Sequence, residues 1–190
     1  MKLIGISGTD GSGKDSVAKV LVEHGWLFIS VSDLLREELA KRGVPLGRQN
    51  LRKLSAQWRR EHGLGVLIDK AVEKFKTNGG DAKYKGLAVA SLRNPGEADR
   101  VHELGGKVVW TDAKPHIRYR RLVSRMRGNE DSVTFEEFMA EEQVQMRHSG
   151  DRATLSLSGV KDLADISIEN SGHDIEAFKI EAEKALAKFL

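Results

Sequence analysis

The chain has 190 residues, 39% of them hydrophobic, with 31 basic and 28 acidic side chains and a formal net charge of +3. This length and composition are typical of one globular α/β domain with room for insertions. The absence of cysteine excludes disulfides, thiolate metal sites and cysteine nucleophiles. No block of Lys and Arg stands apart from acidic neighbours, so we expect no nucleic-acid partner.

Five short apolar runs predict strands that are buried on both faces. They are Leu3–Ile6, Leu27–Val31, Leu87–Ala90, Val108–Trp110 and Ile166–Ile168. The first run is too short for a signal peptide or a membrane span, so we expect a cytoplasmic protein without membrane contact. Polar segments with helical periodicity separate the runs, which is the alternation of a parallel sheet covered by helices.

Helical periodicity predicts eight helices between and after these strands. Their expected ranges are about 14–24, 32–42, 48–61, 64–77, 95–104, 115–127, 134–148 and 174–188. Pro115 suits a first helical turn, and Thr134 with Glu137 fits a capping box. Two mostly helical segments, about 34–86 and about 125–163, are too long to be plain connections. They leave a core of 1–33, 87–124 and 164–190.

The segment between the first strand and the first helix fits the phosphate-binding pattern GxxxxGK, with the sequence Gly8-Thr9-Asp10-Gly11-Ser12-Gly13-Lys14. Glycines let backbone N–H groups turn toward phosphate oxygens, the helix N-terminus adds its dipole, and Lys14 reaches the β and γ phosphates. A glycine-rich turn without a ligand is the alternative, which the strand–loop–helix context disfavours. We expect ATP to contact Gly8, Asp10, Gly11, Ser12, Gly13, Lys14, Asp15 and Ser16.

The residue after Lys14 departs from the usual pattern. That position normally holds Ser or Thr, whose hydroxyl binds Mg²⁺, whereas here it is Asp15, followed by Ser16. Two interpretations of Asp15 stay open: a helix-start carboxylate favoured by the dipole, or a ligand that binds Mg²⁺ directly or through water. Ser16 is the alternative metal contact.

The third strand also departs from the pattern, because it lacks the Asp with which many P-loop enzymes hold their metal. Its sequence runs from Leu87 to Leu92 without an acidic residue. Either Asp15 and Asp10 supply that carboxylate, or Mg²⁺ is held mainly by phosphates and water, or catalysis is impaired. Asp112, at the end of the fourth strand, is a further carboxylate whose favoured role is a helix cap.

Three segments resemble the nucleoside monophosphate kinase family, of which adenylate kinase is the best-known member. They are Gly8–Ser16, Ser32-Asp33-Leu34-Leu35-Arg36 and Leu92-Arg93. Leu92-Arg93-Asn94-Pro95, together with the Gly-Lys-Asp-Ser of the phosphate loop, is also similar to phage-type deoxynucleoside monophosphate kinases. The C-terminal stretch 164–172 more closely resembles dephospho-coenzyme A kinases and their archaeal-type relatives.

The resemblance implies a three-layer α/β/α P-loop fold with a five-stranded parallel sheet. It makes 34–86 a helical acceptor-binding insertion and 125–163 an Arg-rich lid. It places Asp33 and Arg36 at the acceptor and Arg93 on the acceptor's phosphate, a task that suits a planar guanidinium. The alternatives are a helix-start carboxylate for Asp33 and solvated side chains for the two arginines.

The resemblance also assigns residues to the ATP side. Arg121 packs on the ATP base, and Arg125 meets the phosphates at the base of the lid, where cations stabilise charge during transfer. A helix surface is the alternative for both. Asn170 and Gly172 lie near the adenine, chiefly through backbone contacts.

The predicted helix 48–61 is rich in arginine. Leu51, Leu54 and Trp58 share one face, so we expect Trp58 in the core. Around that face lie Arg48, Arg52, Arg59 and Arg60. We expect most of these arginines to be solvated, with one or two of them lining the acceptor pocket.

Together these features predict an ATP-dependent small-molecule kinase with Mg²⁺ as cofactor. It would transfer the γ-phosphoryl group to a nucleotide-like acceptor, a nucleoside monophosphate or dephospho-coenzyme A, with Lys14 and Arg125 neutralising charge. Asp33 is the candidate general base for a hydroxyl acceptor.

The alternative is a nucleotide-binding regulatory module with slow or no ATP hydrolysis. The missing third-strand Asp favours that alternative, and Arg36 and Arg93 disfavour it. The acceptor's identity and the oligomeric state are open at this point.

Overall fold

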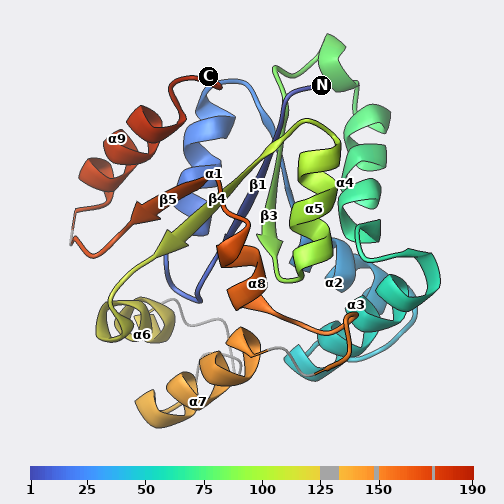
Figure 1. The fold of residues 1–190 in the computed structure, drawn as a ribbon, viewed down its shortest axis with the longest axis vertical. Coiled ribbons are helices and arrows are strands. Elements are labelled where there is room, and N and C mark those ends of the chain that lie inside the picture. The colour runs from blue at the N-terminus through green and yellow to red at the C-terminus, as the bar shows by residue number, and fades with distance from the viewer. Residues whose placement is uncertain (125–132, 148–149, 173) are drawn as a thin grey trace.

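The computed structural model describes residues 1–124, 133–147, 150–172 and 174–190. Five strands form one sheet in the order β2–β3–β1–β4–β5, and every neighbouring pair is parallel (Figure 1). Their bounds are Leu3–Gly8 for β1, Leu27–Ser30 for β2, Leu87–Leu92 for β3, Lys107–Asp112 for β4 and Ile166–Glu169 for β5. The five predicted strands are confirmed.

Helices cover both faces of the sheet, which gives three layers. Their bounds are Lys14–Glu23 for α1, Val31–Lys41 for α2, Arg48–His62 for α3, Val66–Thr77 for α4, Pro95–Glu103 for α5, Pro115–Ser124 for α6, Phe135–Met146 for α7, Leu157–Asp162 for α8 and Ile175–Leu186 for α9. Helices α1 and α9 lie on one face, and α2, α4, α5 and α8 lie on the other (Figure 1). Helix α3 packs on α2 and α4, while α6 and α7 lie beyond the carboxyl ends of the strands.

The two-faced burial follows from the alternation of side chains along each strand. Leu3 and Leu87 point into the core beneath α2, α4 and α5. Ile4 and Ala88, one residue further along, point into the core beneath α1 and α9. Strands buried in this way on both faces read as continuous apolar runs, which is why the sequence located all five.

Local signals in the sequence account for several helix boundaries. Helix α6 begins at Pro115, and α7 has the predicted capping box, in which the Thr134 hydroxyl accepts from the Glu137 amide. The part of the range predicted for α6 that extends past residue 124 lies outside the described residues. Helix α8 and a short 3₁₀ turn at Gly80–Ala82 were not predicted, because such short segments carry little periodicity.

Within the described ranges, no helix combines the length and the hydrophobicity that a bilayer-spanning segment needs.

A polar cluster ties the amino ends of β4 and β5 together around Asp165. Its carboxylate accepts from Lys107 Nζ at 2.7 Å and from the Val108 amide at 2.8 Å, and it contacts His102 Nε2 at 2.8 Å. Burial tends to raise the pKa of Asp165, but these hydrogen bonds outweigh it and lower the pKa to about 2. A carboxyl whose pKa is depressed by folding stabilises the fold above its unfolded-state pKa.

We predict that Asp165→Asn lowers the free energy of unfolding at pH 7 by about 1–2 kcal/mol. The contribution is present above about pH 4, near the ordinary carboxyl pKa of 3.8, and is lost as the pH falls toward 2. Denaturant unfolding at a series of pH values measures it. The control is Asp162→Asn, at an exposed position on α8. If the free energy of unfolding depends on pH in the same way in both variants, the stabilising role of the Asp165 carboxylate is contradicted.

Candidate nucleotide and acceptor site

The loop between β1 and α1 has a backbone shaped to surround an anion. Gly11 and Gly13 have φ values of 78° and 104°, in the left-handed region that favours glycine. A Cβ at Gly11 would lie 2.5 Å from the Arg118 carbonyl oxygen, and one at Gly13 would lie 2.3 Å from Asn170 Nδ2. Space and conformation therefore both require glycine at these positions, as expected of a loop whose N–H groups face a phosphate.

Lys14 lies at the mouth of this loop. Its ammonium donates to the carbonyl oxygens of Gly8 at 3.0 Å and Thr9 at 2.6 Å. The positive charge is therefore held beside the N-terminus of α1, where phosphate groups would also be attracted by the helix dipole.

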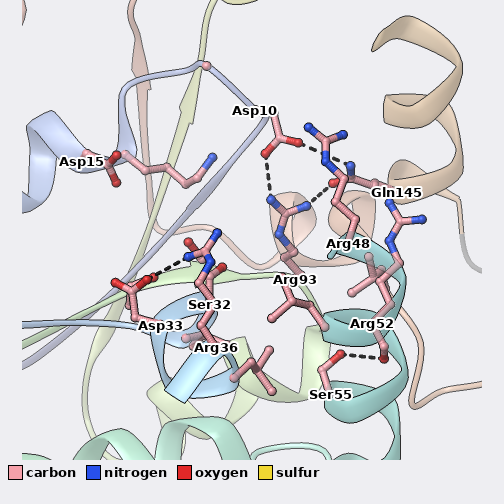
Figure 2. Close-up of a pocket in the computed structure, with 18 of the residues that line it drawn as sticks. Asp10, Asp15, Ser32, Asp33, Arg36, Arg48, Arg52, Ser55, Arg93 and Gln145 are labelled. Atoms are coloured by element: carbon pink, nitrogen blue, oxygen red, sulfur yellow. Dashed lines mark hydrogen bonds and ion pairs between the residues drawn. The ribbon is translucent and has the colours of Figure 1, made fainter. Parts of the chain in front are cut away.

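A cavity of about 740 Å³ opens beside the loop, at the carboxyl ends of β1, β2 and β3 (Figure 2). Parallel α/β sheets place their ligands at this edge. Its charged lining consists of Asp10, Asp15, Asp33, Lys14, Arg36, Arg48, Arg52, Arg59, Arg93 and Arg121. Arg59 and Arg52 are paired with Glu97 and Glu141, which lie outside this lining, so five basic side chains remain against three acidic ones. This small positive excess favours an anionic occupant.

Arg93 reaches from the end of β3 to the phosphate loop. Its Nη2 donates to Asp10 Oδ1 at 2.7 Å, its Nη1 donates to the Gln145 side chain on α7, and the Gln145 amide approaches Asp10 Oδ2 at 3.4 Å (Figure 2). Burial alone would raise the pKa of Asp10, but the charges of Arg93 and Lys14 outweigh it and hold the pKa far below its usual range. The guanidinium of Arg93 therefore links the phosphate loop to α7 at the wall of the cavity.

Asp33 and Arg36 face the cavity from the first turns of α2. Arg36 Nη1 donates to Asp33 Oδ1 at 2.8 Å, with side-chain exposures of 33% and 61% respectively. In the view of Figure 2, Arg93 lies between this pair and the arginines of α3. The structure thus brings Asp33, Arg36 and Arg93 to one cavity, while their contact with an acceptor stays a prediction.

The four α3 arginines lie in three different environments. Arg48 and Arg52 line the cavity, and Arg52 forms an ion pair with Glu141 on α7. Arg60 is exposed, as expected, and Trp58 is buried in the core. Arg59 corrects the sequence-based expectation, because its side chain is only 1% exposed. Arg59 is paired with the buried carboxylate of Glu97 on α5, a contact that no local sequence pattern indicates.

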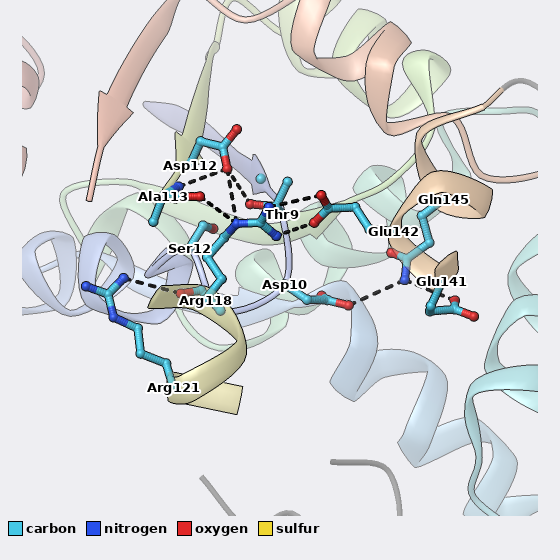
Figure 3. A network of polar contacts seen from close by, with 12 residues as sticks. Thr9, Asp10, Ser12, Asp112, Ala113, Arg118, Arg121, Glu141, Glu142 and Gln145 are labelled. Atoms are coloured by element: carbon cyan, nitrogen blue, oxygen red, sulfur yellow. Dashed lines mark hydrogen bonds and ion pairs between the residues drawn. The ribbon is translucent and has the colours of Figure 1, made fainter. Parts of the chain in front are cut away.

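The phosphate loop is braced from β4 (Figure 3) and, through Asn170, from the end of β5. Thr9 Oγ1 donates to Asp112 Oδ1 at 2.7 Å, and the hydroxyls of Ser12 and Thr111 are 2.7 Å apart. The Asn170 amide donates to the Ser12 carbonyl at 2.9 Å. The loop is thereby held in shape by side chains distant in sequence, so binding would require little rearrangement.

One expectation about these braces needs correction. Asp112 does not cap a helix; its carboxylate accepts from Thr9 and from the Ala113 amide, and Arg118 Nε lies 3.5 Å away. The buried side chain of Asn170 contacts Ser12 and Arg121, while its backbone contact with an adenine stays a prediction. Asp112 ends β4 and Asn170 directly follows β5, so both short polar side chains reach the loop from a strand end.

Arg121 of α6 also lines the cavity. Its Nη2 donates to the Gly172 carbonyl at 2.9 Å and to Asn170 Oδ1 at 3.2 Å, and its Nη1 approaches the Gly11 carbonyl at 3.4 Å. The residues assigned to the ATP base by resemblance, Arg121, Asn170 and Gly172, are therefore neighbours. Arg125, assigned to the base of the lid, lies outside the described residues.

Helix α7 is joined to α6 by a buried arginine that sequence reasoning left unassigned. Arg118 donates to both carboxylate oxygens of Glu142 and, at 2.6 Å, to the Ala113 carbonyl (Figure 3). Its 3% exposure contrasts with the helix surface that a run of arginines indicates. Gln145, which contacts Asp10 and Arg93, was also missed, because a lone Gln on a helix gives no signal.

Comparison with known proteins places the chain in a family. It is 30% identical to the UPF0200 protein of Pyrococcus abyssi, over 99% of this chain and 97% of that one. It is 28% identical to the UPF0200 protein of Thermococcus kodakarensis, over 97% and 96% of the two chains. Residues 4–145 match the family model described as AAA domain. The chain belongs to the UPF0200 family and carries an AAA domain.

Solved structures similar to this UPF0200 protein share its fold at low identity. A Thermus thermophilus protein has a TM-score of 0.60 and 21% identity, covering 99% of this chain and 97% of that one. Shikimate kinase of Bacteroides thetaiotaomicron follows with 0.57 and 16%, over 97% and 98%. Dephospho-CoA kinase of Campylobacter jejuni has 0.52 and 13%, over 99% and 97%. The predicted three-layer P-loop kinase-like fold is confirmed.

The UPF0200 site has few side chains for a metal. Among the described residues, no three His, Cys, Asp or Glu side chains are arranged to hold one. At the end of β3, Ala90 and Ser91 occupy positions where a carboxylate would be sought. Asp15 and Ser16, in the first turn of α1, line the cavity beside the loop. This set fits Mg²⁺, which keeps several waters and takes one or two protein oxygens in addition to phosphates.

Proposed function

We propose that this UPF0200 protein is a phosphotransferase that moves the γ-phosphoryl group of ATP to a phosphate-bearing, nucleotide-like acceptor. The acceptor class is a nucleoside monophosphate or dephospho-coenzyme A. One observation carries the proposal: the phosphate loop and Arg93 face one cavity, with the Arg93 guanidinium 2.7 Å from Asp10 of the loop. A donor phosphate on the loop and an acceptor phosphate on Arg93 would be neighbours, as direct transfer requires.

The guanidinium groups that line the cavity support a phosphate-bearing acceptor. Arg36, Arg48 and Arg93 reach the cavity from α2, α3 and the end of β3. A planar guanidinium meets two phosphate oxygens at once, and a phosphate monoester carries about −1.5 to −2 charges near neutral pH. A phosphorylated acceptor is therefore favoured over a neutral one.

In the proposed reaction, a bond forms between an acceptor oxygen and Pγ, the bond from Pγ to the bridging oxygen breaks, and ADP leaves. Lys14 and the loop amides hold the donor phosphates, and Arg93 and Arg36 orient the acceptor. Mg²⁺, when bound, neutralises phosphate charge. Asp33 would take the proton of a hydroxyl acceptor, whereas an ionised phosphate acceptor needs no base.

The remaining assignments belong to the same proposal. Segment 34–86 would bind the acceptor, and segment 125–163 would act as a lid that excludes water, with Arg125 stabilising transferred charge. Arg121 would lie against the ATP base. Support for the first assignment comes from α2 and α3, whose arginines line the cavity.

An ADP-release screen with Mg²⁺ and ATP tests this function. Nucleoside monophosphates and dephospho-coenzyme A are the candidate acceptors, and shikimate is the control acceptor without a phosphate. We expect at least one phosphate-bearing acceptor to stimulate ADP release well above hydrolysis by water, and shikimate to have no effect. If no acceptor stimulates release, the proposal fails. A regulatory nucleotide-binding module, which the missing carboxylate at the end of β3 favours, would then replace it.

The metal role of Asp15 has its own test. We predict that Asp15→Asn raises the Mg²⁺ concentration that half-maximally strengthens ATP binding by about tenfold. Calorimetric ATP titrations at several Mg²⁺ concentrations measure this directly. The matched control is Asp15→Ser, which restores the common motif and should keep Mg²⁺-dependent binding. Unchanged Mg²⁺ dependence in Asp15→Asn would assign the carboxylate to the helix start alone.

A further inference from the structure

A fully buried ion pair joins α3 to α5 behind the cavity. Arg59 donates to Glu97 Oε1 from Nη2 at 2.7 Å and from Nε at 3.1 Å, and the two side chains are 1% and 0% exposed. Removing two charges from water carries a large desolvation penalty, and well-packed apolar residues often stabilise a core as well or better. Stability alone is therefore a weak reason for this pair.

The second oxygen of Glu97 holds the backbone at Arg93. Glu97 Oε2 accepts from the Arg93 amide at 2.7 Å and from the Asn94 amide at 3.2 Å. The same carboxylate thus binds Arg59 with one oxygen and the start of α5 with the other. A carboxylate that accepts several hydrogen bonds fixes each donor relative to the others.

The hydrogen bonds of the sheet do not by themselves fix the direction of the chain at Arg93. Along β3, Ala90 pairs with Ile6 but Leu92 pairs with Ser7, so the register shifts and Ser91 is passed over. Ser91 has φ 71°, in the left-handed region that is uncommon for serine. Bulges of this kind re-aim the residues that follow them. The direction of Arg93 is therefore set by contacts beyond the strand ladder, and the Glu97 carboxylate supplies one of them.

The same corner anchors the segment that leads into α8. Arg59 Nη1 donates to the Ala153 carbonyl at 2.9 Å, and the Ser156 amide donates to the Arg93 carbonyl at 2.9 Å. The Asn94 side chain donates to the Arg152 and Thr154 carbonyls at 2.8 and 2.7 Å. Helix α3, the end of β3 and segment 151–156 therefore meet on one buried polar network.

We propose that Arg59 and Glu97 form a positioning pair that sets the place and direction of the Arg93 guanidinium. Neither residue needs to touch the substrate. The pair acts through the Arg93 backbone, and it couples that backbone to α3, whose Arg48 and Arg52 line the same cavity. The consequence for catalysis rests on the proposed function, in which Arg93 binds the acceptor's phosphate.

Glu97→Gln is the first test. The amide keeps one oxygen, which can serve either the Arg93 amide or Arg59, and it loses the charge that holds the guanidinium. We expect amide hydrogen exchange at Arg93 and Asn94 to quicken by about tenfold or more, as for loss of a hydrogen bond to a charged group. The acceptor KM should rise by about tenfold for the same reason, with ATP affinity within about twofold of the wild type.

Two further variants complete the design. Arg59→Lys keeps a buried positive charge but has fewer donors, and it replaces Glu97→Gln should that variant fail to fold. Glu103→Gln is the matched control, because it makes the same change on the same helix and breaks an exposed ion pair with Arg100 without touching Arg93. The control should leave exchange at Arg93 and both substrate affinities unchanged.

The outcomes separate this inference from the proposed function. A folded variant whose Arg93 amide exchanges as in the wild type overturns the positioning role. Equal losses of acceptor and ATP affinity overturn it too, because they indicate a general disturbance. If no acceptor stimulates the wild type, the proposed function fails, and the positioning role is then decided by the exchange data and by a crystal structure of the variant. If the Arg93 guanidinium still donates to Asp10 in that crystal structure, as it does in the wild type, the positioning role is contradicted.

Discussion

Replacing Lys14 with alanine is expected to abolish acceptor-dependent ADP release while leaving the fold intact. The Lys14 ammonium lies at the mouth of the phosphate loop, where it donates to the backbone carbonyls of Gly8 and Thr9. In the proposed function, this charge stabilises the phosphates that the loop would hold. Removal of one preorganised group that stabilises transition-state charge lowers kcat by about 10²–10³.

The matched control is Lys19→Ala, which removes the same charge from an exposed position on the same helix. It should keep the wild-type rate. Far-UV circular dichroism and thermal unfolding of both variants establish that the fold is retained, since substitutions at exposed positions usually change stability by less than about 0.5 kcal/mol. A folded Lys14→Ala protein with wild-type ADP release would refute the kinase interpretation.

The fold could be predicted almost entirely from the sequence, because its signals are local. Strands buried on both faces appear as uninterrupted apolar runs, such as Leu87–Ala90, and the phosphate loop is a contiguous motif. Two helix starts were indicated by the residues themselves, Pro115 in the first turn of α6 and Thr134 at the N-cap of α7. The short helix α8 was not predicted, because its six residues complete less than two turns and show little periodicity.

The site was predictable only where its residues follow a motif or a strand end. The cavity does collect the phosphate loop, Asp33, Arg36 and Arg93, as strand order alone would suggest. The pairing of these residues was not predictable. Arg93 meets Asp10 across 83 positions of sequence, and Arg59 meets Glu97 across 38. A single sequence holds no record of such long-range contacts.

Arg59 illustrates the physical reason for these misses. An arginine on a helix is solvated by default, because its burial requires a partner that offsets the loss of hydration. That partner, Glu97, is the third residue of α5 and forms a capping box with Asn94, which the sequence analysis did not identify. The spacing indicates a helix start, but it says nothing about which buried cation the carboxylate also binds.

Arg93→Ala should weaken acceptor binding far more than ATP binding. Loss of a charge-assisted contact between arginine and phosphate costs about 1.5–3 kcal/mol, or roughly ten- to a hundredfold in affinity. Acceptor KM from the ADP-release assay and ATP affinity from calorimetry measure the two effects separately. The control is Arg100→Ala, which removes an arginine of α5 that is paired with Asp69 and Glu103 instead of facing the cavity.

The pairing of Arg93 with Asp10 complicates the single variant, and a double variant resolves the complication. Without Arg93, the Asp10 carboxylate loses its closest positive partner and would repel the donor phosphates, so ATP binding would also weaken somewhat. Arg93→Ala combined with Asp10→Asn removes both charges. We expect ATP affinity to return close to the wild-type value in the double variant, while acceptor KM stays raised.

These two variants decide between an acceptor-binding Arg93 and an Arg93 that only neutralises the loop. If Arg93 served the loop alone, Asp10→Asn would make it dispensable, and the double variant would recover wild-type acceptor KM. A regulatory nucleotide-binding module predicts a third pattern, in which no acceptor stimulates ADP release and slow hydrolysis is unaffected by Arg93→Ala. Only a raised acceptor KM that persists in the double variant assigns the guanidinium to the acceptor's phosphate, because the charge on Asp10 no longer contributes in that protein.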